Sequence, residues 1–210
     1  MISFQDLTLA NWGRHEQAIM DSELMYPDAI RTPREEFINI LSEGGFIAKI
    51  VLVDSEYAGK AVGYELTPDE LPEYGLKDAP AETRVMYLMD IVISARFQGR
   101  GLGTLLLKEF IRGASSTGYG LLAGHFRPNS SLSLIRKLGA TEKGVWKDWE
   151  RTGEDYVLCS LDLSKQLPVP IRAAKAMPVA VTLNEGTPEF GVSGYHMLME
   201  SHISIANGMK

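Results

Sequence analysis

Cysteine is almost absent from this sequence of 210 residues, since Cys159 is the only one. A single cysteine cannot form an internal disulfide, and the sequence has no Cys/His cluster with the spacing of a metal site. A chain of this length buries enough apolar surface to fold without a disulfide or a structural metal. We therefore expect no metal, and we expect Cys159, inside an apolar stretch, to pack in the core.

Long hydrophobic runs are also missing. No stretch approaches the ~18 apolar residues of a membrane span. The first residues, MISFQD, lack the basic and apolar regions of a signal peptide. We expect a cytoplasmic protein that does not bind membranes.

The sequence has no excess of positive charge, because its formal net charge is −6. A broad basic surface for nucleic acid is therefore not expected. Basic residues do gather locally between 96 and 112, at Arg96, Arg100, Lys108 and Arg112. This cluster suits a small anionic ligand, but a solvated helix face explains Lys108 and Arg112 equally well.

Hydrophobic residues make up 45% of the sequence, and their periodicity predicts a mixed α/β chain. Strands are expected at 3–7, 46–53, 60–66, 85–94 and 120–126, and in a hairpin of 141–150 with 155–163. Helices are expected at 11–25, 33–43, 102–113 and 130–138. Asn11 and Thr32 are the predicted N-caps, and Glu35 would close a capping box with Thr32.

The composition changes after Leu163. Three prolines, Pro168, Pro170 and Pro178, argue against a long helix or a central strand at the start of this segment. Further on, alternating apolar residues predict a strand at 179–183, and helical spacing predicts a helix at 194–208. We expect a domain at 1–163 and an ordered C-terminal arm at 164–210, docked on the domain or on a second copy, with a homodimer favoured over a monomer.

A glycine-rich turn lies between the apolar strand 85–94 and the helix that begins near Leu102. It reads FQGRGLGT, with Gly99, Gly101 and Gly103 at alternate positions. Glycine permits positive φ and lets a ligand approach the backbone, and a helix N-terminus attracts anions. The turn therefore indicates either a packing requirement or a phosphate site. It matches neither the P-loop pattern nor the G-x-G-x-x-G dinucleotide fingerprint.

Gln98-x-x-Gly101-x-Gly103, after a buried strand and at the start of a helix, resembles the pyrophosphate loop of the GNAT superfamily of N-acetyltransferases. The segment SLSLIRKLGA (131–140) is similar to the helix that follows the fifth strand in that family. The order of elements matches too, and the resemblance covers roughly residues 1–163.

The resemblance implies an α/β (α+β) fold with a mixed, mostly antiparallel central sheet, flanked by helices and splayed between its fourth and fifth strands. Acetyl-CoA is the implied co-substrate. Its pantetheine arm would pair with the backbone of Ile91, Val92 and Ile93, and Asn129 would also reach it. Its pyrophosphate would rest on the turn, formed by Gln98, Gly99, Arg100, Gly101, Leu102, Gly103 and Thr104.

The implied reaction is attack of an amine on a thioester, so a base must remove a proton from the amine. Asp90, inside the strand 85–94, occupies a position where the family often has a base, although a structural role would equally explain a carboxylate there. The tyrosine that often protonates the departing thiolate is replaced by Ile135. His125 is a substitute acid, with a structural histidine as the alternative.

The acceptor amine belongs to a small molecule or a protein, and the sequence does not separate the two. The loop 67–84 leads into the strand that carries Asp90, and its acidic residues suit a cationic amine or a simply solvated loop; they are Asp69, Glu70, Glu73, Asp78 and Glu82. An N-acetyltransferase is the expected function. The alternative is a non-catalytic acyl-CoA-binding sensor or assembly module with the same fold.

Overall fold

A computed structural model describes residues 1–165. The strand predicted at 179–183 and the helix predicted at 194–208 lie outside the described residues. Within the described part, the elements follow the predicted order. The strands are β1 (Ile2–Asp6), β2 (Phe46–Val53), β3 (Glu56–Leu66), β4 (Val85–Ile93), β5 (Leu121–Phe126), β6 (Thr141–Trp146) and β7 (Tyr156–Asp162). The α-helices are α1 (Leu9–Glu23), α2 (Arg34–Ser42), α3 (Leu102–Ser116) and α4 (Ser130–Lys137).

Two predicted helix caps are wrong. Thr8 is the N-cap of α1, and Asn11 is the N3 residue whose side chain completes the capping box. Pro33 is the N-cap of α2, and no side chain caps that helix. Thr32 instead donates its backbone N–H to the Glu23 carboxylate, 2.7 Å away. Local capping patterns fit two nearby positions in each case: a reciprocal bond between Thr8 and Asn11 decides the start of α1, and the contact of Thr32 with Glu23 decides that of α2.

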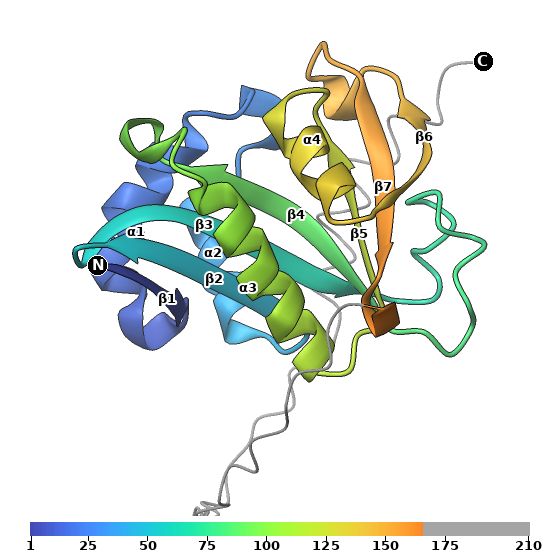
Figure 1. Cartoon of the computed structure of the whole chain (residues 1–210), viewed down its shortest axis with the longest axis horizontal. Helices are drawn as coiled ribbons and strands as arrows, with labels where there is room; N and C mark the ends of the chain where they lie inside the picture. The colour runs from blue at the N-terminus through green and yellow to red at the C-terminus, as the bar shows by residue number, and fades with distance from the viewer. Residues whose placement is uncertain (166–210) are drawn as a thin grey trace, which may run out of the picture. The chain divides into compact units, whose positions relative to one another are not determined.

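The strands form one mixed sheet in the order β1-β2-β3-β4-β5-β7-β6. Every neighbouring pair is antiparallel except β4 and β5. These two strands pair only from Val85–Tyr87 to Leu121–Ala123, and β4 continues for six further residues without pairing to β5. Figure 1 shows the two strands diverging, with α3 on one face of the sheet and α1 and α2 on the other. The predicted fold and its splay are confirmed.

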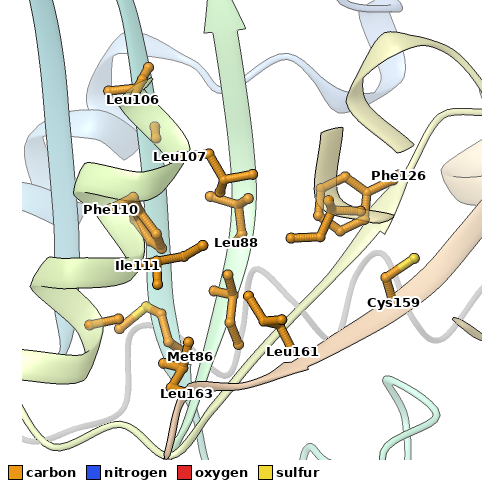
Figure 2. Packing of buried hydrophobic residues seen from close by; sticks show 14 of the residues in the cluster. Met86, Leu88, Leu106, Leu107, Phe110, Ile111, Phe126, Cys159, Leu161 and Leu163 are labelled. Atoms are coloured by element: carbon orange, nitrogen blue, oxygen red, sulfur yellow. The ribbon is translucent and has the colours of Figure 1, made fainter. Parts of the chain in front are cut away.

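The hydrophobic core lies between α3 and the sheet (Figure 2). From α3, the apolar face contributes Leu106, Leu107, Phe110 and Ile111. Met86 and Leu88 of β4 lie against this face, and β7 extends the cluster with Cys159 and Leu161. Burial raises the pKa of the Cys159 thiol to about 11, so this residue is an unreactive part of the core, as its sequence context predicts.

A β-bulge in β4 determines which face Asp90 occupies. Val62 of β3 pairs with Asp90, whereas the next residue, Gly63, pairs with Leu88, so Met89 is an extra residue in β4. Simple alternation would place Asp90 on the α3 face together with Leu88. The extra residue shifts the alternation and places Asp90 on the same face as Tyr87, toward α1 and α2.

Candidate active site

The glycine turn follows the end of β4, the strand that diverges from β5. Gly99 and Gly101 have φ values of +74° and +77°, and a Cβ atom built on either one would meet no atom within 4 Å. The protein therefore leaves the space in front of this backbone open, while the left-handed conformation requires glycine. Gly103 is different, because it is helical and a Cβ atom added to it would lie in ordinary contact with the side chains of Ile93 and Leu134, 3.7 Å away.

The backbone amides of this turn point to an anion site. Among the residues that the structure describes, no group accepts a hydrogen bond from the amides of residues 99 to 104. These amides precede or begin the 15-residue helix α3, whose N-terminus carries partial positive charge. Arg100 donates to the Arg96 carbonyl, 3.1 Å away, which keeps its guanidinium beside the turn. The arrangement suits a diphosphate.

The other residues predicted to bind the cofactor surround the same turn. Gln98 donates its side-chain amide to the Ile93 carbonyl, 2.9 Å away, and so fastens the turn to the end of β4. Leu102 is only 2% exposed, so it offers its backbone alone. Asn129 is the N-cap of α4 and accepts a hydrogen bond from the amide of Ser131 through Oδ1 (2.8 Å), which leaves its amide nitrogen for a ligand.

The gap between β4 and β5 completes this half of the site. From Leu88 onward, β4 pairs with β3 but not with β5, so Ile91, Val92 and Ile93 have one unpaired edge. An extended ligand arm can hydrogen-bond along such an edge as an added strand would. The open turn, the amides without acceptors and the strand edge together fit the diphosphate and pantetheine parts of acetyl-CoA.

On the face of the sheet that α1 and α2 cover, Asp90 belongs to a buried network of charged residues. Asp90 is 6% exposed and forms an ion pair with Lys60 of β3, whose side chain is fully buried. Lys60 also contacts the Glu23 carboxylate at 2.6 Å, and Tyr26 donates its hydroxyl to Asp90. Burial lowers the pKa of Lys60, and the nearby Glu23 opposes this effect. Asp90 therefore accepts a hydrogen bond through Oδ1, while its buried Oδ2 has the Lys60 ion pair and no hydrogen-bond partner among the described residues.

His125 lies on this face too, among aromatic side chains from β4, the segment 67–84, β6 and the β6–β7 connection. Its Nδ1 is 2.8 Å from the Tyr87 hydroxyl, and the Trp149 ring stacks on it with a centroid distance of 3.8 Å. Burial lowers the pKa of His125 to about 3, so the imidazole is neutral at physiological pH. Its Nε2 is buried and has no hydrogen-bond partner among residues 1–165. A neutral imidazole with an unused nitrogen can exchange a proton with a bound substrate.

Sequence reasoning missed a hydroxyl on this face. Ile135 is buried in the core (1% exposed), so α4 presents no proton donor at the position where the family often has tyrosine. Tyr156, the first residue of β7, is 4% exposed, and within the described part of the chain its hydroxyl has no hydrogen-bond partner. In the sequence it appears as an ordinary aromatic strand residue, so no local signal distinguishes it.

The segment 67–84 contains no helix or strand and folds in a series of turns. Tyr74 attaches it to the aromatic cluster, with its ring centroid 4.7 Å from that of Tyr87. Glu70 accepts hydrogen bonds from the amide and hydroxyl of Thr67, both at 2.7 Å, so it stabilises its own turn. That the acidic residues of this segment attract a cationic amine stays a prediction.

A splayed mixed sheet with an open glycine turn after its fourth strand is the architecture expected of an acyl-CoA-dependent acyltransferase. The model of the acetyltransferase (GNAT) family matches residues 9–139. The chain belongs to this family of acetyltransferases. The family match favours an enzyme over a non-catalytic acyl-CoA-binding module. No curated protein sequence matches the chain.

Solved structures with this fold include several N-acetyltransferases. Arabidopsis thaliana NAA60 in complex with acetyl-CoA is 17% identical, with a TM-score of 0.64 over 78% of this chain and 99% of that one. The ribosomal-protein-S18-alanine N-acetyltransferase of Escherichia coli is 16% identical, with a TM-score of 0.60 over 80% and 100%. Ard1 from Thermoplasma volcanium is 10% identical, with a TM-score of 0.60 over 77% and 97%.

Proposed function

We propose that the protein transfers the acetyl group of acetyl-CoA to a primary amine that reaches the reaction centre from the α1–α2 face. The observation that carries this proposal is the arrangement around the end of β4. The open turn at Gly99 and Gly101 lies next to the gap between β4 and β5, while Asp90 and His125 face the other way. Acetyl-CoA supplies an activated acyl group, and the protein holds it, admits the amine and removes its proton.

His125 is the proposed proton acceptor. Its Nε2 has no partner among the described residues, and its neutral state leaves one ring nitrogen with a lone pair. Because a pKa of about 3 makes the imidazole a weak base, it takes the proton after the neutral amine has attacked, when the nitrogen becomes acylated and strongly acidic. The proton then passes to the departing thiolate, and CoA leaves as a thiol. Asp90, predicted from the sequence as the base, is proposed instead to act as a fixed negative charge. This charge stabilises the amine nitrogen as that atom becomes positive during attack.

Asp90→Asn separates these two roles. We expect acetyl-CoA affinity to stay unchanged and turnover to fall about 10- to 100-fold at every pH, the size of one charge interaction of ~1.4–2.8 kcal/mol. Steady-state kinetics from pH 6 to 9 measure the loss. A loss of ~10²–10⁴-fold that shrinks as pH rises would assign the base role to Asp90, because more of the amine is then already neutral.

The acceptor is tested with a panel of amines analysed by mass spectrometry. The panel contains polyamines, free amino acids, a peptide with an internal lysine and peptides that begin with alanine. The last are included because the similar Escherichia coli enzyme is a ribosomal-protein-S18-alanine N-acetyltransferase. We expect one class to gain an acetyl group in an enzyme-dependent manner. Acetylation of none of them would contradict the proposed function.

A cytoplasmic location and a homodimer are also proposed. None of the described helices is long and apolar enough to cross a membrane. The homodimer is supported by the sequence of 164–210, whose apolar alternation and helical spacing need a surface to pack on. Sedimentation of the full chain and of a chain that ends at Lys165 tests this. We expect a dimer that the truncation abolishes, and an equal state of association for both chains would refute the proposed role of the arm.

A further inference from the structure

The fully buried Lys60 is the least expected feature of the chain outside the proton path. Its ammonium lies between the carboxylates of Glu23 and Asp90 and over the rings of Tyr26 and Phe37, 5.7 and 5.2 Å from their centroids. A buried lysine is costly unless its charge is paired. Neither the binding of acetyl-CoA nor the proton path described above uses it.

Through this lysine, the network joins segments that are far apart in the sequence. Glu23 ends α1, Lys60 lies in the middle of β3, and Asp90 follows the bulge of β4. The second oxygen of Glu23 accepts the amide of Thr32, and Tyr26 donates to Asp90. Both Tyr26 and Thr32 belong to the connection between α1 and α2, residues 24–33.

Bonds within this connection fix its shape rather than its position on the sheet, because Arg31 donates to the Tyr26 carbonyl (3.0 Å) and pairs with Asp28 (2.6 Å). Its only helical element in the structure is the three-residue turn Asp28–Ile30. Leu24 and Met25 are exposed. The turn packs against Trp149–Arg151 of the β6–β7 connection, which carries the ring stacked on His125. The connection 24–33 therefore borders the α1–α2 face of the sheet, from which the acceptor is proposed to approach.

We propose that Glu23, Tyr26, Lys60 and Asp90 form a latch that fixes the connection 24–33 against β4 and thereby positions the acceptor. In this role Lys60 and Tyr26 are positioning residues that touch neither the amine nor acetyl-CoA. The latch rests on the proposed function in one respect only: the positioning of an acceptor requires that the protein catalyses acetyl transfer. The attachment of the connection to the sheet is a property of the free protein.

Tyr26→Phe in the full-length protein is the sharpest test, since it removes one hydroxyl and leaves the ring over Lys60. We expect amide hydrogen exchange of residues 24–33 to become ~10-fold faster or more, with the exchange of the core strands unchanged. For the most active amine of the panel, we expect KM to rise ~5- to 10-fold while kcat stays within ~2-fold. Acetyl-CoA affinity, measured by calorimetry, should equal that of the parent. Lys60→Met should accelerate the same amides further.

Tyr57→Phe is the matched control. Its hydroxyl is also buried and contacts Ser22 of α1 at 3.1 Å, but it does not connect to residues 24–33 or to β4. We expect parental exchange and KM for this variant. The latch is refuted if Tyr26→Phe leaves the exchange of 24–33 at the parental rate, or if Tyr57→Phe accelerates it equally. Should Lys60→Met not fold, Tyr26→Phe alone decides. An inactive parent would contradict the proposed function, whereas the exchange pattern would still decide the latch.

Discussion

Gly101→Glu should abolish acetyl-CoA binding and leave the protein folded. Among residues 1–165, a Cβ atom added to Gly101 would meet no atom within 4 Å, so the backbone surroundings accept the first carbon of the new side chain. Its carboxylate would occupy the position proposed for the diphosphate and repel it in a partly dehydrated site. We expect affinity in calorimetry to fall by more than ~100-fold, which corresponds to ~2.8 kcal/mol.

Gly118→Glu is the control for backbone strain. Gly118 also has positive φ, at +88°, but it follows the C-terminal end of α3. Both variants should lose a similar amount of stability, about 1 kcal/mol, from forcing a non-glycine residue into the left-handed region. Only Gly101→Glu should lose acetyl-CoA. An affinity within about threefold of the parent for Gly101→Glu would show that the diphosphate binds elsewhere.

His125→Phe should lower turnover by ~10²–10⁴-fold while acetyl-CoA affinity stays unchanged, because the variant keeps an aromatic ring beside Trp149 and removes the proton acceptor. Stopped assays with the best amine of the panel measure the loss. Tyr74→Phe serves as the control, since it removes a neighbouring hydroxyl that bonds to Tyr64 and not to His125. Turnover within about threefold of the parent for His125→Phe would exclude His125 from the proton path.

The pH dependence of the parent gives an independent check on His125. A folded-state pKa of about 3 means that the imidazole is already neutral well below pH 6. The histidine therefore contributes no inflection near its ordinary value of 6.5. Instead, kcat/KM should rise with pH until the acceptor amine is deprotonated. A rise centred near pH 6.5 that disappears in His125→Phe would show that burial does not hold the pKa down.

Features encoded by neighbouring residues could be predicted from the sequence. The turn around Gly101 was found because strand, glycines and helix follow one another directly, and the structure confirms its left-handed backbone. The order of the elements was predicted for the same reason, since the hydrophobic periodicity of each strand or helix is visible within its own segment. The cofactor-binding role of Asn129 follows from the family resemblance and stays a prediction, whereas its capping of α4 appears only in the structure.

The acceptor face could not be predicted, because long-range contacts create it. The bulge at Met89 has no sequence signal, yet it determines on which face Asp90 lies. Lys60 appears in the sequence as an ordinary strand residue, and its partner Glu23 is 37 positions away. The surroundings of His125 come from β4 and the β6–β7 connection, so its lowered pKa exists only in the folded protein.

The release of free thiol from acetyl-CoA by the full-length protein, with and without amine, tests the central claim most directly. We predict that release depends on an amine of the panel, that it continues over many turnovers, and that Gly101→Glu abolishes it. Tight binding of acetyl-CoA without amine-dependent thiol release on any member of the panel would contradict the assignment as an N-acetyltransferase.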